Sequence, residues 1–224
     1  MTFLNFFYFF IFYSFLGWLT ETTFVSIGRR QFVNMGFLDG PFSPIYGSGA
    51  LAIILLVLPF HYNFFLFFIM SIIIASIIEY ITSLFFEKFF NITWWDYSDK
   101  PLNLQGRICL EYSFYWGILS VLILTFIHPH IIPFINFLSN YVGLIGIIIF
   151  MIYFIIDATD TFKDLLRLKK TISQKISRRI ISNKKINRLI KSFPDFKSKI
   201  NNDFTTKLKV KIKSNHHRPD KIYK

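Results

Sequence analysis

The chain of 224 residues is 53% hydrophobic and 20% aromatic, contains 30 phenylalanines and carries a formal net charge of +12. This composition excludes a disordered chain, a disulfide-rich secreted module and a typical soluble enzyme. It favours a membrane protein with a basic appendage.

The positive charge is concentrated at one end of the chain. Residues 1–162 contain five Lys/Arg and nine Asp/Glu, a net charge of −4, whereas residues 163–224 contain twenty and four, a net charge of +16. We therefore expect a transmembrane domain over 1–160, a basic amphipathic cytoplasmic helix over 161–192 and a disordered basic tail over 193–224.

Five apolar stretches are long enough, or nearly so, to cross a bilayer as helices, which takes about 20 residues. The first has no basic segment before it and no small-residue cleavage site, so we interpret it as a retained span. The fifth is interrupted by Ser139 and Asn140 and could begin later or bend there. The fold class predicted is all-α, a polytopic membrane helix bundle of about five transmembrane helices, with four or six as alternatives; the spans expected are 3–27, 42–60, 64–86, 110–127 and 134–156.

The distribution of Lys and Arg predicts the orientation of these spans. With the N-terminus outside, all 25 Lys/Arg lie on the inner side, and the outer connections 61–63 and 128–133 contain none. We therefore expect a multi-pass protein of a cytoplasmic membrane, with the N-terminus outside and the C-terminus cytoplasmic.

The two long inner connections carry more turn-forming and aromatic residues than generic linkers. The first contains Asp-Gly-Pro, a strong turn signal, and the second contains a Trp pair that fits the membrane interface. The candidate functional residues in and next to these loops are Asp39, Gly40, Pro41, Tyr46, Trp94, Trp95, Asp96 and Tyr97.

Several blocks of the chain, in order, resemble one bacterial family of small multi-pass proteins, the CmpB-like type IV ABC-transporter family. The resemblance covers roughly residues 5–130 and implies an integral membrane protein of permease type, without bringing catalytic or substrate residues. The blocks are Gly17-Trp18 with Glu21-Thr22, Gly36-Phe37-Leu38 with Gly40-Pro41, Pro44-Ile45-Tyr46-Gly47, Trp94-Trp95-Asp96-Tyr97-Ser98, Gly106-Arg107-Ile108-Cys109-Leu110 and Trp116-Gly117.

Ionisable residues inside a bilayer are expensive and point to a polar path or to partners. Glu79 and Glu21 each lie on a stripe of small and polar residues at helical spacing, and Arg107 and Glu111 are one helical turn apart. One hypothesis is that these faces meet and line a path for a solute or proton. The alternative is that the small residues are packing seams and the carboxylates bond to Arg107, Arg29 or loop amides.

Motifs of known chemistry are largely absent, and we expect no enzymatic activity and no cofactor. There is no Gly-x-x-x-x-Gly-Lys-Ser/Thr, so an ATPase that drives this protein is a separate chain. Cys109 is a lone cysteine, and His128-Pro129-His130 is interpreted as an interfacial loop and not as a metal site.

The basic segment 161–192 has an apolar side at helical spacing with lysines and arginines between, a pattern typical of helices that lie on anionic lipid. RNA and a partner helix are alternatives, although no RNA-binding motif occurs and nucleic acid is not expected.

Three functions are compatible with these observations. The first is a permease subunit with its ATPase supplied by a separate chain, acting as a homo- or hetero-oligomer. The second is a non-transporting scaffold or regulator of the cell envelope. The third is an intramembrane enzyme acting on lipid, with Glu79, Asp96 and Arg107 near one interface.

Overall fold

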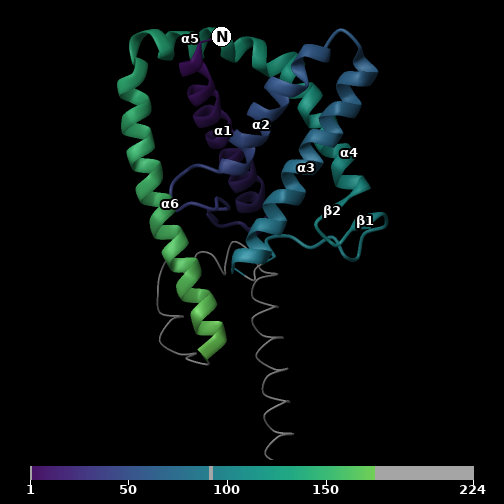
Figure 1. The fold of residues 1–224 in the computed structure, drawn as a ribbon, viewed down its shortest axis with the longest axis vertical. Helices are drawn as coiled ribbons and strands as arrows, with labels where there is room; N and C mark the ends of the chain where they lie inside the picture. The colour runs from purple at the N-terminus through teal and green to yellow at the C-terminus, as the bar shows by residue number, and fades with distance from the viewer. Residues whose placement is uncertain (1, 91–92, 175–224) are drawn as a thin grey trace, which may run out of the picture.

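The computed structural model describes residues 2–90 and 93–174, with side chains through Arg167. Figure 1 shows a bundle of helices and one short hairpin. The helices are α1 (Phe3–Arg29), α2 (Pro44–Leu56), α3 (Phe64–Phe90), α4 (Leu110–Leu122), α5 (His128–Tyr141) and α6 (Gly143–Gln174), and the strands are β1 (Asn103–Leu104) and β2 (Ile108–Cys109). The all-α fold class is confirmed.

Within the described residues, four helical segments are long and apolar enough to cross a membrane, so the prediction of a polytopic membrane bundle is confirmed. They are Phe3–Arg29, Phe64–Phe90, Leu110–Tyr141 and Gly143–Arg167. In Figure 1 the chain runs down in α1, up in α2, down in α3 and up in α4; it then crosses the top of the bundle in α5 and descends in α6. Both long inner connections therefore lie toward the lower end.

The second apolar stretch forms a shorter helix than expected. The sequence predicted a span over 42–60, but α2 covers only 13 residues, about 20 Å at 1.5 Å per residue. Prolines explain both limits: Pro44 occupies the first turn, and Pro59 lies in a 3₁₀ turn, Leu58–Phe60, that follows the helix. Residues 42 and 43 belong to the preceding loop.

The last two apolar stretches are also divided differently from the prediction. A π-helical turn, Ile123–Ile127, joins α4 to α5, and α5 lies across the end of the bundle. The break falls at Val142 and Gly143, where Gly143 has a φ of 57°. The stretch 134–156 is therefore part of two helices, and the alternative of a later start is the one observed.

The final helix continues past the expected boundary at 160 without a break, through Gln174. Residues 161–174 of the predicted amphipathic helix are thus an extension of α6. The remainder of that helix and the tail 193–224 lie outside the described residues.

The apolar core lies in the upper half of the bundle, around α1. It combines α1 side chains with residues of α2, α3, the π-helical turn, α5 and α6, namely Tyr8, Phe9, Tyr13, Ile53, Ile54, Val57, Phe67, Leu124, Ile131, Ile135 and Ile147. Below this core, buried polar side chains such as Ser71, Glu79 and Ser83 occur together with further apolar contacts.

Helices α1 and α2 interlock through two glycines, which lets their backbones approach closely. A Cβ atom at Gly17 would lie 2.2 Å from Cγ of Tyr46, and one at Gly47 would lie 2.1 Å from Oγ of Ser14. The Tyr46 ring therefore lies across α1 in the space that a side chain at position 17 would fill.

This contact gives a matched pair of variants on one helix. Gly17→Ala forces the Tyr46 ring to move, so we expect it to destabilise the protein by about 1–3 kcal/mol. Gly28→Ala meets nothing within 4 Å and should leave stability unchanged or raise it slightly. Thermal unfolding in detergent measures both; equal melting temperatures for the two variants would contradict the interlocked α1–α2 contact.

Candidate functional site: carboxylates and tyrosines inside the bundle

Glu79 lies in the interior of the bundle and not on its lipid-facing side. Its side chain is 6% exposed, whereas Ile77 and Ile81 on the same helix are 46% and 56% exposed. The hydroxyl of Tyr97, from the loop before β1, donates to Glu79 Oε1 at 2.9 Å. The other oxygen, Oε2, is buried and has no hydrogen-bond partner among the described residues.

A second carboxylate, Glu21 on α1, approaches the same region from the opposite side. The hydroxyl of Tyr46 on α2 donates to Glu21 Oε2 at 3.3 Å. The Tyr46 ring lies 6.0 Å from the Trp116 ring on α4. Trp116 in turn lies beside Glu79, with its indole Nε1 buried there.

These contacts join Glu21, Tyr46, Trp116, Glu79 and Tyr97 into one group, which we call the carboxylate–tyrosine cluster. Its members come from α1, α2, α4, α3 and the loop before β1, so five parts of the chain converge on it. Of the ion pairs among the described residues, none involves either of its carboxylates.

The polar faces of α3 and α4 meet next to this cluster. Ser76 donates to Ser113 Oγ at 2.8 Å. Gly117 lies against α3, since a Cβ there would be 2.3 Å from Ile72. Small residues thus hold α3 and α4 together where Glu79 and Trp116 lie.

Tyr97 is fixed by the hairpin that caps the lower end of α4. Its backbone N–H donates to the carbonyl of Gly106 at 2.8 Å, and its ring stacks on Tyr112 at 4.7 Å. Burial, and next the nearby Glu79 charge, raise the pKa of Tyr97, so its hydroxyl remains a donor across the physiological range.

The hairpin requires the glycine at position 106. The turn from Leu104 to Arg107 is closed by a 3.1 Å backbone bond and has positive φ at Gln105 and Gly106. A Cβ at Gly106 would also lie 2.7 Å from Asp96 Oδ1.

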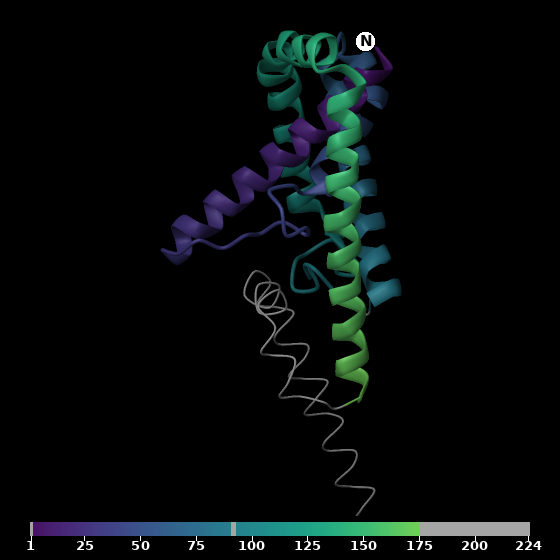
Figure 2. The same cartoon turned by 90° about the vertical axis from the view of Figure 1, so that its left-hand side faces the viewer.

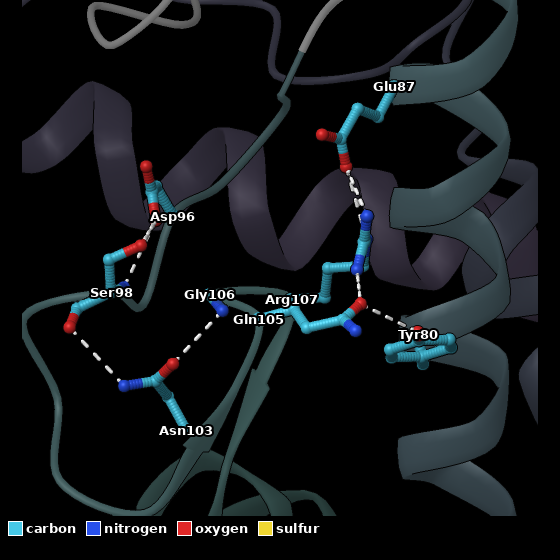
Figure 3. Close-up of polar contacts among 8 residues, drawn as sticks. All are labelled: Tyr80, Glu87, Asp96, Ser98, Asn103, Gln105, Gly106 and Arg107. Carbon is cyan, nitrogen blue, oxygen red and sulfur yellow. Dashed lines mark hydrogen bonds and ion pairs between the residues drawn. The ribbon is translucent and has the colours of Figure 1, made fainter.

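Arg107 contacts α3 and not Glu111, which corrects the prediction of one helical turn between them. Helix α4 begins only at Leu110, so Arg107 lies in the hairpin, where its Nη2 pairs with Glu87 at 2.6 Å (Figure 3). Its guanidinium also bonds to Gln105 and lies 5.3 Å from the centre of the Tyr80 ring.

Glu111 pairs with Lys100 instead, at 2.9 Å, with both side chains 40% exposed. The hydrogen bond from Lys100 to Glu111, followed by the attraction of its charge, raises the pKa of Lys100. Glu111 is thus a partly exposed group of the hairpin and not a member of the cluster.

The remaining candidates of the second loop have separate partners. Trp95 donates its indole N–H to the carbonyl of Arg107 at 2.8 Å. Asp96 accepts the backbone N–H of Ser98 at 3.0 Å (Figure 3). The Trp94 ring packs against Phe37 and Phe86, which joins this loop to the first.

The first loop is organised by Asn34, a residue that the sequence did not single out. Its Oδ1 accepts Trp18 Nε1 at 2.7 Å and the N–H of Gly36 at 2.9 Å, and its Nδ2 donates to the carbonyl of Asp39 at 2.9 Å. The loop is therefore tied to α1 through one amide side chain.

Asp157 on α6 holds the other end of this loop, and it too was not among the candidates. Its carboxylate accepts the backbone N–H groups of Asp39 at 3.1 Å and Gly40 at 2.9 Å. The Tyr153 hydroxyl donates to it at 3.3 Å. The available signal was a carboxylate at the end of the last apolar stretch.

Gly40 allows this approach, because a Cβ there would lie 2.8 Å from Asp157 Oδ2. Pro41 follows directly and continues the turn toward α2. In Figure 2, α1 runs obliquely to the bundle, and its lower end lies away from α6. The first loop runs back from this end toward α6, so its hydrogen bonds to Asp157 connect α1 and α6.

His128 is buried, which corrects its interpretation as part of an interfacial loop. It is the first residue of α5, is 2% exposed, and its Nδ1 lies 3.0 Å from the Tyr13 hydroxyl. In the part of the chain that the structure describes, no three His, Cys, Asp or Glu residues are grouped so as to hold a metal ion.

Comparison with known families identifies the chain. Residues 8–162 match the family model described as Putative ABC-transporter type IV. The chain belongs to this family. The match extends beyond the resembling blocks to include Asp157 and Phe162 on α6, and it establishes a multi-pass membrane protein. No curated protein and no solved structure matches the chain.

The Asp157 contact can be tested by amide exchange. In Asp157→Asn only one side-chain oxygen remains to accept two backbone N–H groups, and a lost bond to a charged acceptor costs about 1.5–3 kcal/mol. We expect hydrogen–deuterium exchange over residues 38–41 to accelerate by about tenfold or more.

The control is Asp160→Asn, one turn away on α6, whose carboxylate pairs with Lys163 at 3.4 Å with both side chains about half exposed. Exchange in the loop should be unchanged in this variant. Unaltered exchange in Asp157→Asn would show that the loop does not depend on α6.

Proposed function

We propose that the chain is the membrane-spanning subunit of a transporter whose ATPase is a separate chain. The observation that carries this proposal is the Glu79 carboxylate, which lies inside a membrane bundle at 6% exposure and forms no ion pair with a described residue. A carboxylate at such a position is expensive, and in membrane proteins such groups characteristically lie on solute or ion pathways.

The neighbours of Glu79 support a pathway more than a packing seam. A seam of small residues needs no carboxylate, whereas here Glu21 and Glu79 extend from α1 and α3 toward tyrosines of α2 and the loop before β1. Four hydrogen-bonding side chains and the Trp116 indole thus line one interior region. The lipid-facing side of α3, by contrast, is formed by Ile73, Ile77, Ile81 and Leu84.

The lower end of the bundle supports a connection to a partner that supplies energy. There α6 contacts the first loop through Asp157, and the second loop contacts Glu79 through Tyr97. In addition, the aromatic ring of Phe162 on α6 lies against Phe37 of the first loop and Phe90 of α3. A partner that moves α6 or either loop would therefore act directly on the surroundings of the cluster.

The absence of a nucleotide-binding motif from the 224 residues supports placing ATP hydrolysis on a different chain. The basic segment from residue 163 onward is the part of the sequence that, by its charge, we expect on the cytoplasmic side with that partner.

The proposal predicts an ATPase activity that depends on this chain. The tagged protein is purified from native membranes in mild detergent and reconstituted into lipid vesicles, and ATP hydrolysis is measured with and without it. We expect Glu79→Gln to retain the associated ATPase subunit but to lower chain-dependent ATP hydrolysis at least tenfold, because the group at the centre of the pathway is lost.

The matched control is Glu111→Gln, which removes a partly exposed carboxylate of the hairpin and should retain wild-type hydrolysis within about twofold. Full activity in Glu79→Gln, or the absence of any ATPase from the purified complex, would contradict the transport role and favour a scaffold.

A further inference from the structure

Two carboxylates of the bundle, the buried Glu79 and the partly buried Glu21, have hydrogen-bond partners that are neutral groups. Glu79 accepts from Tyr97, and Glu21 accepts from Tyr46. A carboxylate removed from water is costly unless several donors or a positive charge replace its hydration, and one tyrosine hydroxyl replaces only part of it.

The nearby cations are already engaged with other acids. Arg107 pairs with Glu87 through two nitrogen atoms, and Lys100 pairs with Glu111. Among the described residues, no lysine or arginine forms an ion pair with Glu21 or Glu79. A positive charge at these carboxylates would therefore come from outside the chain's own described side chains.

The groups around the carboxylates suit a positive charge. The ring of Tyr46, whose hydroxyl contacts Glu21, lies 6.0 Å from the ring of Trp116, and the ring of Tyr97, whose hydroxyl contacts Glu79, stacks on that of Tyr112. Aromatic faces attract cations, most strongly where water is excluded. Glu79 Oε2 is buried in a residue that is 6% exposed, and it accepts no hydrogen bond of normal length and angle from the described residues, although the Trp116 indole lies beside it.

We propose that the carboxylate–tyrosine cluster is a cation-binding site, at which Glu79 and Glu21 accept positive charge from outside the chain as a proton or as a small monovalent cation. This deepens the proposed transport function, on which it rests, by naming the charge of the species that the pathway handles. A proton would form an O–H bond on Glu79 Oε2; a metal or ammonium ion would contact the same oxygen without covalent change.

The ionisable groups that face Glu79 define what else can titrate nearby. They are Tyr97 from the loop before β1, Tyr46 from α2 with Glu21 behind it, and Tyr112 and Cys109 beside Tyr97. Of these residues only Glu21 carries a carboxyl group; the others are three tyrosines and a cysteine. Infrared spectroscopy can therefore follow the carboxyl bands of the two glutamates separately from these neighbours.

The experiment uses the full chain in lipid nanodiscs and infrared difference spectra between wild type and Glu79→Gln or Glu21→Gln. In the first arm the pH is varied at constant salt. In the second arm Na⁺, K⁺ and methylammonium replace a bulky organic cation at constant pH. Conversion between carboxylate and carboxylic acid bands in the first arm identifies the proton, and a shifted carboxylate band in the second identifies the small cation.

Either response supports the proposal if it is lost in Glu79→Gln and retained in Glu111→Gln. Should Glu79→Gln not fold, Tyr97→Phe serves instead, since it keeps the carboxylate and must shift the same band by removing its donor. A wild-type spectrum in which no carboxyl band responds to pH or to cations, or in which the response survives both glutamate variants, overturns the proposal. That outcome would leave chain-dependent ATP hydrolysis, and with it the transport role, untouched.

Discussion

The structure depends on one constraint: a carboxylate within a lipid bilayer must be enclosed by protein. Glu79 meets this constraint because α3 turns it toward α4, and the Ser76–Ser113 hydrogen bond and Gly117 keep these two helices in contact. Glu21 on α1 is only partly enclosed, and the Tyr46 hydroxyl donates a hydrogen bond to its carboxylate. The arrangement of α1 to α4 is therefore the arrangement that keeps both acids away from lipid.

The loops at the lower end extend the same enclosure. The hairpin places Tyr97 over Glu79, and Arg107 anchors that hairpin to α3 through Glu87. The first loop is held between α1 and α6, by Asn34 at one end and Asp157 at the other. The loop residues Gly40, Trp95, Tyr97 and Gly106 thus help to hold the helix ends around a polar interior.

The sequence predicted what depends on composition and periodicity, and it missed what depends on contacts between distant segments. The small and polar stripe around Glu79 correctly indicated a helix face in contact with another helix. Nothing local could pair Glu21 with Tyr46 or Asp39 with Asp157, since these contacts join different helices and loops. The expected Arg107–Glu111 proximity failed because the chain forms a hairpin before α4 begins. The sequence predicted one span over 134–156, whereas the structure divides these residues between α5 and α6. The apolar composition of α5 resembles that of a membrane span, but α5 lies across the end of the bundle (Figure 1).

The central claim, that Glu79 lies on an interior face between α3 and α4, is tested most directly by disulfide trapping in native membranes. In a Cys109→Ser background, Ser76→Cys with Ser113→Cys should form a cross-link on mild oxidation, because the two hydroxyl oxygens are 2.8 Å apart. Ser76→Cys with Ile118→Cys, whose side chain is exposed on α4, should not. Cross-linking of the Ile118 pair in place of the Ser113 pair would place Glu79 on a different face of the bundle and contradict the account.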